Sequence, residues 1–311
     1  MILMNEKKEI CLLTEALDRA NIECAELLQS REFLLGKRLI AFWKAIKTAN
    51  FKEVVKILKK KFARVKIKEI HFLNKKNDIP QFGLIDTSVL VEKKIAVYTC
   101  ITGNYDPLNE PVIKYPNVDF FVYSEKQRKS ENWTYRPIPP NIMRMGNVLA
   151  NRYIKFHPKE LFTNYDFAVY VDGNVKVVAD IRRLVKCTQV LSGIAMFDHC
   201  LRDCLYDEAE ACSQYGKGNR QYIAKQVKNY MSRKFPPHFG LKEATVIFSD
   251  LNNSNSPKFF EKWWEELCES KSMRDQLALP YSIWSAGFDM SSIGSLGDNV
   301  YLNQFFRVYS H

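Results

Sequence analysis

A nearly continuous apolar run over residues 165–171 ends abruptly at Asp172-Gly173-Asn174. This profile is typical of a strand that is buried on both faces, as in a parallel sheet. Two further apolar runs, 94–102 and 118–123, predict strands, and the pattern over 145–156 predicts a helix. Strands that alternate with helices favour an α/β fold, in which ligands bind beyond the carboxyl ends of the strands.

The composition is that of a folded globular protein. The 311-residue chain is 46% apolar and 13% aromatic, with only 12 Gly and 8 Cys. These values exclude disordered, collagen-like and disulfide-scaffold classes, and the length suggests one large domain with a smaller one. No hydrophobic stretch reaches the roughly 18 residues of a membrane span, and the first residues do not resemble a secretory leader. Because no CxxC pair is present, we expect reduced thiols and a cytoplasmic protein.

Positive charge is concentrated in one segment. The chain has 46 basic and 35 acidic residues, a formal charge of +11, and residues 37–68 carry twelve basic residues against one acid, also +11. The rest of the chain therefore sums to zero. We expect no nucleic-acid partner, because no zinc finger, RNA-recognition signature or second basic patch accompanies this segment.

The N-terminal part has helical patterns. Apolar residues from Ile10 to Leu27 recur at alternating steps of three and four, which predicts a short coiled coil over 10–31 and self-association, or else a helix packed on its own domain. Residues 37–68 place Trp and Leu on one side and Lys and Arg on the other. This pattern favours an interfacial helix on an anionic membrane over a solvated basic face, since anionic lipid attracts such a segment by about 1 kcal/mol per basic residue.

These patterns divide the chain into three parts. Residues 1–68 form the predicted helical region, with the short coiled coil and the basic amphipathic helices. Residues 69–93 are polar, contain Pro80, and read as a connector. Residues 94–311 are the predicted α/β domain.

The Asp172-Gly173-Asn174 turn offers a carboxylate and an amide oxygen two residues apart at the end of a strand. Such hard oxygen donors suit a divalent cation that carries a diphosphate, although Asp-Gly is also a common turn dipeptide. Arg152 and Lys155 precede the strand at i, i+3 and so share a helix face. There they are expected either to meet phosphate oxygens or to pair with acids.

Two later segments add polar candidates. Asp275 follows an aromatic helical pattern over 259–267, in which Trp263 and Trp264 are expected to be core residues rather than a sugar platform. His199 and Arg202 are also spaced i, i+3. Either both lie on the acceptor side and contact the acceptor hydroxyls or the departing phosphate, or they are structural, with a salt bridge on the helix and His199 on the surface. A zinc site of His199 with Cys200, Cys204 and Cys212 is disfavoured, because one helix cannot easily wrap four ligands tetrahedrally.

Taken in order, these motifs resemble the bacterial and plant glycosyltransferase-like family related to plant mucilage-synthesis proteins. The resemblance runs from about residue 95 to His311 and rests on 98–106, 152–158, 170–174, 197–209, 240–247, 263–264 and 274–281. It implies a GT-A type, Rossmann-like mixed sheet with helices on both faces, preceded here by the N-terminal helical region.

The resemblance also implies roles for particular residues. The first strand and its turn would receive the nucleotide base and ribose, through Tyr98, Thr99, Gly103, Tyr105 and Asp106. Arg152 and Lys155 would face the diphosphate. Asp172, Gly173 and Asn174 take the place of the DXD motif, which holds Mn²⁺ or Mg²⁺. An amide oxygen binds a hard cation less strongly than a carboxylate, so Asn174 leaves metal dependence open. In similar enzymes a histidine near the C-terminus binds the metal. His311 would take this role, unless it belongs to a disordered C-terminal tail.

An inverting transfer needs a base near the acceptor hydroxyl, and Asp275 is the first candidate. The alternative is that the neighbouring Arg274 holds Asp275 ionised in a structural role. Glu243 and His199 are the alternative candidates for the base, and Arg202 is a candidate contact of the departing phosphate. These residues do not distinguish an inverting from a retaining mechanism.

We therefore expect an enzyme, a hexosyltransferase. It would move sugar from a nucleotide-diphosphate sugar to a surface-glycan or lipid-linked acceptor, such as lipopolysaccharide or capsule, on the inner face of the cytoplasmic membrane. The alternatives are a non-catalytic membrane-recruited scaffold, which Asn174 favours, and a nucleic-acid-binding protein.

Overall fold

The computed structural model describes residues 93–112 and 114–309. The predictions for the coiled coil over 10–31, the basic segment 37–68, the connector up to residue 92 and His311 lie outside these residues. None of the helices in the described segments is long and apolar enough to span a bilayer.

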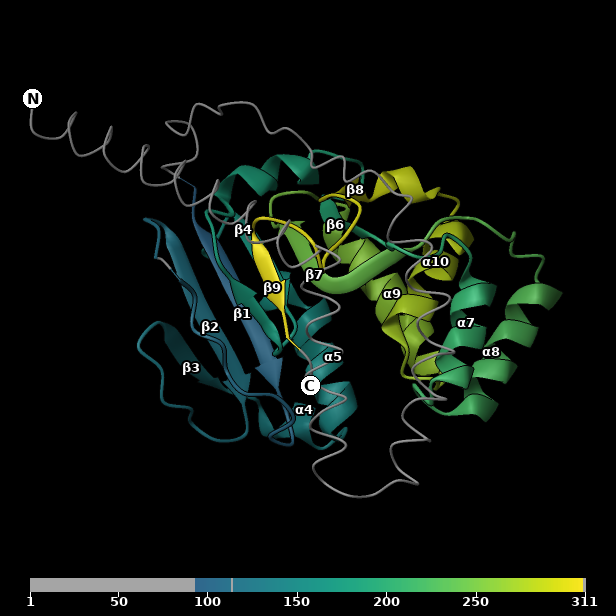
Figure 1. The fold of residues 1–311 in the computed structure, drawn as a ribbon, viewed down its shortest axis with the longest axis horizontal. Coiled ribbons are helices and arrows are strands. Elements are labelled where there is room, and N and C mark those ends of the chain that lie inside the picture. Colours follow the sequence, from purple (N-terminus) through teal and green to yellow (C-terminus); the bar gives the residue numbers. More distant parts are fainter. Residues whose placement is uncertain (1–92, 113, 310–311) are drawn as a thin grey trace, which may run out of the picture. The chain divides into compact units, whose positions relative to one another are not determined.

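The described chain is built around a mixed sheet of seven strands in the order β3-β2-β1-β4-β7-β6-β8 (Figure 1). Their bounds are β1 Ile95–Ile101, β2 Val118–Ser124, β3 Trp133–Pro137, β4 Phe167–Val171, β6 Ile194–Asp198, β7 Lys242–Asp250 and β8 Gly294–Ser295. β1 is parallel to both β2 and β4, whereas β7 runs antiparallel between β4 and β6. The predicted strands and the mixed α/β class are confirmed.

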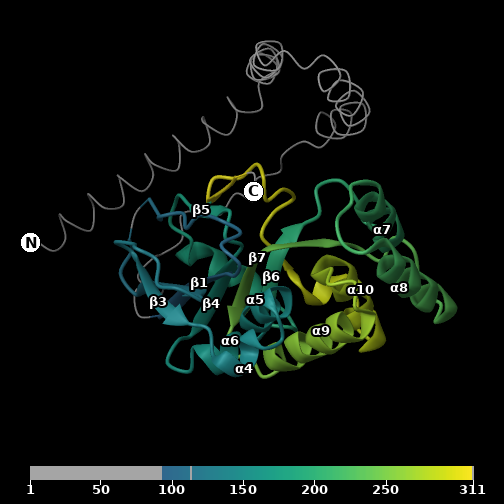
Figure 2. The ribbon, with the colours of Figure 1, turned by 90° about the horizontal axis from the view of Figure 1, so that it is seen from below.

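Alternation along the strands divides the core between the two faces of the sheet. On one face, Tyr98 and Tyr170 pack against α5 (Asn147–Phe156), α9 (Ser256–Ser270) and α10 (Asp275–Ser285). On the other face, Val97 and Val169 lie under a 3-10 helix, Arg182–Thr188, and under a small antiparallel sheet. That small sheet pairs β5 (Val175–Val177) with β9 (Phe306–Val308). Two short helices, α4 (Pro140–Met143) and α6 (Pro158–Leu161), flank α5 (Figure 2).

Helical periodicity explains which sides of α5 and α9 are buried. Ala150 and Ile154 of α5 are buried four residues apart, and Phe260, Trp263 and Leu267 of α9 are buried at spacings of three and four. Trp263 is 1% exposed, so its prediction as a core residue is confirmed. The opposite side of α5, at Arg152 and its neighbours, is left for polar contacts.

A third apolar cluster joins α7 (Leu205–Gln214) and α8 (Arg220–Ser232) to α10, through residues that include Tyr230, Phe235 and Tyr281. Figures 1 and 2 both place α8 at the outer edge of the described domain.

The expectation of no second basic patch is wrong. From Gly216 to Leu241 the chain has six basic residues and no acid, and all six are exposed: Lys217, Arg220, Lys225, Lys228, Arg233 and Lys234. The zero charge of the chain outside 37–68 conceals this patch, because acids elsewhere offset it in the total.

Candidate functional site

Two turns meet at the carboxyl edge of the parallel strands. β1 and β4 are adjacent and parallel, so the turn at 102–106 and the turn at Asp172-Gly173-Asn174 leave the sheet side by side. A Cβ atom at Gly173 would lie 2.9 Å from both Cβ and Oδ2 of Asp106, and the Asn109 side chain donates to the Gly173 carbonyl at 2.9 Å. Glycine at this position therefore lets the two turns pack together.

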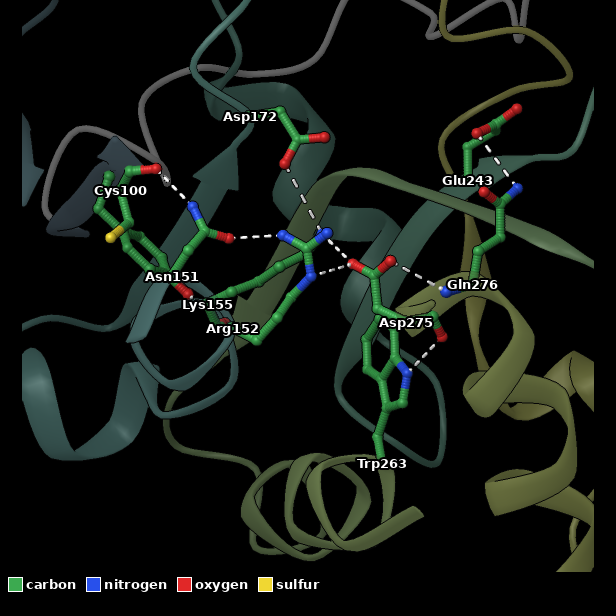
Figure 3. Close-up of polar contacts among 10 residues, drawn as sticks. Cys100, Asn151, Arg152, Lys155, Asp172, Glu243, Trp263, Asp275 and Gln276 are labelled. Carbon is green, nitrogen blue, oxygen red and sulfur yellow. Dashed lines mark hydrogen bonds and ion pairs between the residues drawn. The ribbon is translucent and has the colours of Figure 1, made fainter. Parts of the chain in front are cut away.

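A buried ion-pair network lies beside these turns (Figure 3). Lys155 Nζ donates to Asp275 Oδ2 at 2.7 Å, and Arg152 Nε lies 3.2 Å from the same oxygen. Lys155 Nζ also lies 3.7 Å from Asp172 Oδ1. The side chains of Lys155 and Asp275 are only 1% and 7% exposed, whereas that of Arg152 is 20% exposed. The helix-face prediction for Arg152 and Lys155 is confirmed, and their partners here are acids.

These contacts fix the charge of Asp275. Burial alone would raise the pKa of Asp275, but the charges of Arg152, Lys155 and Arg274 outweigh burial and hold this pKa well below its usual range. A carboxylate with so low a pKa accepts protons poorly near neutral pH. The expectation of Asp275 as the base is therefore corrected: it is an ionised anchor for two cations, and Arg274 is not its principal partner.

Core residues hold this network in place. Trp263 Nε1 donates to the Asp275 carbonyl at 2.7 Å, and the Tyr98 hydroxyl donates to the Lys155 carbonyl at 2.8 Å. Tyr98 and Thr99 are each 1% exposed. The expectation that they contact a nucleotide is corrected, because both side chains point into the core and Tyr98 supports α5 instead.

The turn after β1 is more accessible. Tyr105 is 71% exposed, and the Gly103 amide donates to Glu125 Oε1 at 2.7 Å. Gly103 has a φ of +61°, and a Cβ there would lie 2.8 Å from Asn147 Nδ2. Asp106 is 8% exposed and faces Gly173 rather than solvent. Tyr105 is thus the residue of this group that is best placed for a ligand.

A second polar cluster joins the loop between β6 and α7 to α7 itself and to the start of β7. His199 Nε2 lies 3.4 Å from Glu208 Oε2 and 3.6 Å from Glu243 Oε1, and Arg202 Nη1 lies 3.0 Å from Glu208 Oε2. His199 and Arg202 lie in a loop, because α7 begins only at Leu205. The expectation that a helix carries these two residues is therefore wrong. The expectation of a surface histidine is also wrong, since His199 is 7% exposed.

Hydrogen bonds orient the His199 ring. Its Nδ1 accepts the backbone N–H groups of Leu201 and Arg202 at 3.2 and 3.0 Å. In the neutral ring the proton therefore sits on Nε2 and faces the two glutamates. Two local donors that need Nδ1 as acceptor also explain why the chain forms a loop here rather than a helix.

The two glutamates differ in their affinity for protons. Burial raises the pKa of Glu243, and the neighbouring His199 offsets this only in part. Burial also acts on Glu208, but the hydrogen bond from His199 and the charge of Arg202 lower its pKa. Paired carboxylates whose pKa values are pushed apart are typical of acid-base sites.

Gln276 joins the two clusters. Its backbone N–H donates to Asp275 Oδ1 at 3.1 Å, and its side-chain Nε2 donates to Glu243 Oε2 at 3.3 Å. Figure 3 shows Asp275 between the two cations on one side and Gln276 on the other, with Glu243 beyond. Residues from five separated parts of the chain thus form one continuous polar site.

Sequence reasoning missed one member of this site, Gln276. It lies inside the motif at 274–281 but was given no role. The partner that makes Gln276 a link between the clusters, Glu243, lies 33 positions away, which the local sequence does not reveal.

The donor atoms at the Asp172 turn fit a metal ion only in part. The amide of Asn174 donates to the Tyr309 carbonyl at 2.7 Å, and the Lys155 ammonium stands near Asp172. Across residues 93–112 and 114–309, no group of three or more His, Cys, Asp and Glu side chains is placed to hold a metal ion. The described residues thus do not form a metal site by themselves, and the zinc alternative finds no support among them.

Fold and site together define an α/β protein with a polar, charge-rich site at the carboxyl edge of its parallel strands. A model of the TOD1/MUCI70 glycosyltransferase-like domain family matches residues 144–311, more than half of the chain. The chain therefore belongs to this family, as the motifs predicted. No curated protein sequence matched.

The chain is similar to two solved glycosyltransferases. The bifunctional glycosyltransferase WbbM is 13% identical, with a TM-score of 0.40 over 66% of this chain and 39% of WbbM. The galactosyltransferase LgtC, solved with donor and acceptor sugar analogues, is 13% identical, with a TM-score of 0.38 over 65% of this chain and 72% of LgtC. The chain thus spans less than half the length of WbbM.

Proposed function

We propose that this protein is a GT-A type glycosyltransferase of the hexosyltransferase class. It would move a sugar from a nucleotide-diphosphate sugar to a surface-glycan or lipid-linked acceptor, such as lipopolysaccharide or capsule. The observation that carries the proposal is the single network in which Gln276 links the Arg152-Lys155-Asp275 cluster to the His199-Glu208-Glu243 cluster.

The first cluster supports a donor side. Glycosyl transfer leaves negative charge on the departing diphosphate, and a positioned cation in a site with little water stabilises it. Arg152 is the more accessible of the two cations, while buried Lys155 neutralises Asp275. We therefore assign Arg152 to the diphosphate and Lys155 to fixing the orientation of Asp275.

The second cluster supports an acceptor side. An inverting transfer removes a proton from the acceptor hydroxyl, and a base with a raised pKa does so more effectively near neutral pH. We assign this role to Glu243, whose pKa is raised by burial, and a positioning role to His199. Arg202 keeps Glu208 ionised and so preserves the difference between the two glutamates.

A divalent metal stays part of the proposal. GT-A type enzymes often use one, and Asp172 supplies a carboxylate at the expected turn, with Asn174 two residues on. Mn²⁺ or Mg²⁺ there needs further ligands, for which His311 remains the candidate. No step above depends on the metal.

Calorimetric titration with uridine and guanosine diphosphates, with and without Mn²⁺, tests the donor side. We expect one nucleotide to bind, and Arg152→Gln to weaken binding at least about tenfold, as loss of a charged hydrogen-bond donor does. Arg136→Gln, an exposed arginine on β3, is the matched control and should bind as wild type does.

A panel of nucleotide sugars then tests the acceptor side. Glu243→Gln should lower transfer by about 10²–10⁴-fold, the range for loss of a general base, while nucleotide affinity stays within about twofold. Failure of wild-type protein to bind any nucleotide or to turn over any donor would refute the proposal.

The main rival is a non-catalytic scaffold with the same fold, and Asn174 in place of an acid is the observation that favours it. It predicts normal folding with no nucleotide binding, with or without Mn²⁺.

For location, we propose a peripheral protein on the inner face of the cytoplasmic membrane, with residues 37–68 in contact with the lipid and self-association through residues 10–31. Cell fractionation and analytical ultracentrifugation test these two proposals.

A further inference from the structure

The basic patch around α8 lies outside the site described above. Its six basic residues, from Lys217 to Lys234, are all exposed, and no acid interrupts them between Gly216 and Leu241. Arg233 Nη2 lies 3.8 Å from Glu269 Oε1, whereas Lys225 and Lys228 form no ion pair with any described residue. Unpaired charges of one sign on a folded surface create a local positive potential that attracts a polyanion.

Packing fixes which side of α8 faces out. Ile223, Gln226 and Tyr230 are buried on the inner side, toward α7, α9 and α10. By helical periodicity, Lys225 and Lys228 lie at the middle of the opposite side. Figures 1 and 2 show α8 as the outermost helix on its side of the described domain, so no other described helix lies over this side.

Two large exposed side chains, a tyrosine and a methionine, border the basic residues. Tyr222 is 42% exposed and Met231 is 61% exposed, and on a helical projection they flank the lysines on opposite sides. Tyrosine is enriched at membrane interfaces, where its ring lies at the level of the headgroups. Lysine has a long apolar stem that reaches toward a surface while its charge remains in water.

The patch also adjoins the proposed acceptor side. The backbone N–H of Lys217 donates to the Cys212 carbonyl at 2.8 Å, and the Cys212 thiol donates to Glu208 Oε1 at 3.3 Å, so the loop before α8 lies beside Glu208. Glu208 is on α7, which packs against α8. A surface that docks on α8 would therefore lie next to the second cluster.

We propose that the exposed side of α8 docks on anionic lipid headgroups. An outermost helix with separate lysine charges, bordered by Tyr222 and Met231, suits a flat anionic surface. Single-strand nucleic-acid sites instead combine a basic groove with several aromatic rings on which successive bases stack, whereas the exposed side of α8 has one aromatic ring, Tyr222. Docking would also bring a lipid-linked acceptor to Glu243, and this corollary rests on the proposed function. The lipid contact itself does not depend on that function.

Co-sedimentation of the full chain with vesicles of 30% phosphatidylglycerol in phosphatidylcholine tests the proposal. The variant Lys225→Glu, Lys228→Glu replaces two attractive charges by two repulsive ones, and we expect the partition coefficient to fall at least about tenfold. The control variant Lys126→Glu, Lys129→Glu makes the same change at the same spacing, on an exposed loop between β2 and β3. It should lose less than about threefold, and thermal midpoints show whether both variants fold.

A second background separates α8 from the basic segment 37–68. The same two double variants are made in a full chain that carries Lys59→Gln, Lys60→Gln and Lys61→Gln, and the loss specific to α8 should persist. Fluorescence anisotropy of a labelled RNA with the same variants covers the rival polyanion. Three results would each overturn the proposal: no binding of the wild-type chain to anionic vesicles, equal losses in the α8 and control variants, or an α8 variant that loses RNA binding and keeps vesicle binding. Because the assay needs no nucleotide sugar, it gives the same answer whether or not the protein transfers sugar.

Discussion

Asp275 shows how the partners of a residue, rather than its sequence neighbours, decide its chemistry. The motif Arg274-Asp275-Gln276 drew attention to it, but two cations on α5, more than 100 positions earlier, decide its chemistry. A carboxylate held by buried cations serves to position them. The local sequence contains the carboxylate but not the distant cations, so under the proposed function Glu243 replaces Asp275 as the candidate base.

The first prediction concerns the stability that Asp275 provides. Asp275→Asn leaves the buried Lys155 without its closest counter-charge, and loss of one partner of a buried pair costs about 3–5 kcal/mol. The folded-state pKa of Asp275 is depressed, so its contribution is fully present above the unfolded-state pKa of about 3.9 and is lost as pH falls below it. The free energy of unfolding from urea titration at neutral pH and near pH 3 measures both effects.

The exposed Asp207→Asn on α7 is the control for this prediction and should change the free energy of unfolding by less than about 0.5 kcal/mol. A difference between wild type and Asp275→Asn that stays constant from neutral to acidic pH would contradict the assigned ion pairs.

At the scale of elements, local pattern located β1, β2, β4, α5 and α9, because each is a continuous apolar run or has clear helical periodicity. It did not identify β7, which begins with Lys242 and Glu243, both buried. The Lys242 ammonium donates to Asp198 at 2.6 Å, and Glu243 accepts from Gln276. Polar residues become strand residues here through partners that lie 44 and 33 positions away, which local periodicity cannot detect.

The second prediction concerns how α8 is anchored. The Tyr230 hydroxyl donates to Glu266 on α9 at 2.5 Å and accepts from Gln226 at 2.7 Å, and its ring stacks on Tyr281 of α10 at 3.9 Å. Tyr230→Phe keeps the stacking but leaves buried polar groups unsatisfied, so we expect a loss of about 1–3 kcal/mol. Thermal unfolding measures the loss, and amide exchange should rise first in α8.

Tyr222→Phe removes a hydroxyl from the exposed side of the same helix and is the matched control. It should leave both stability and exchange unchanged within about 0.5 kcal/mol. Equal effects of the two substitutions would mean that the buried hydroxyl network does not hold α8 to the domain.

At the scale of the whole molecule, a sum of charges proved less informative than their distribution. The formal charge of +11 equals the charge of residues 37–68, and that equality suggested a neutral domain. The fold shows that neutrality arises from an exposed basic helix offset by acids elsewhere, some of them buried in the candidate site. Composition records how many charges a chain has, whereas only the fold determines which ones share a surface.

The last prediction follows from two basic regions in one chain. If both contact anionic lipid, Lys59→Gln, Lys60→Gln and Lys61→Gln should weaken vesicle binding without abolishing it. Binding free energies of separate sites add, so the fold-losses of this triple substitution and of Lys225→Glu, Lys228→Glu should multiply. Raising the salt from about 0.05 to 0.3 M should weaken the wild type more than the combined variant, because screening removes an attraction that the variant has already lost. Vesicle co-sedimentation across that salt series measures both effects, and identical salt dependence of the two proteins would contradict an electrostatic contact.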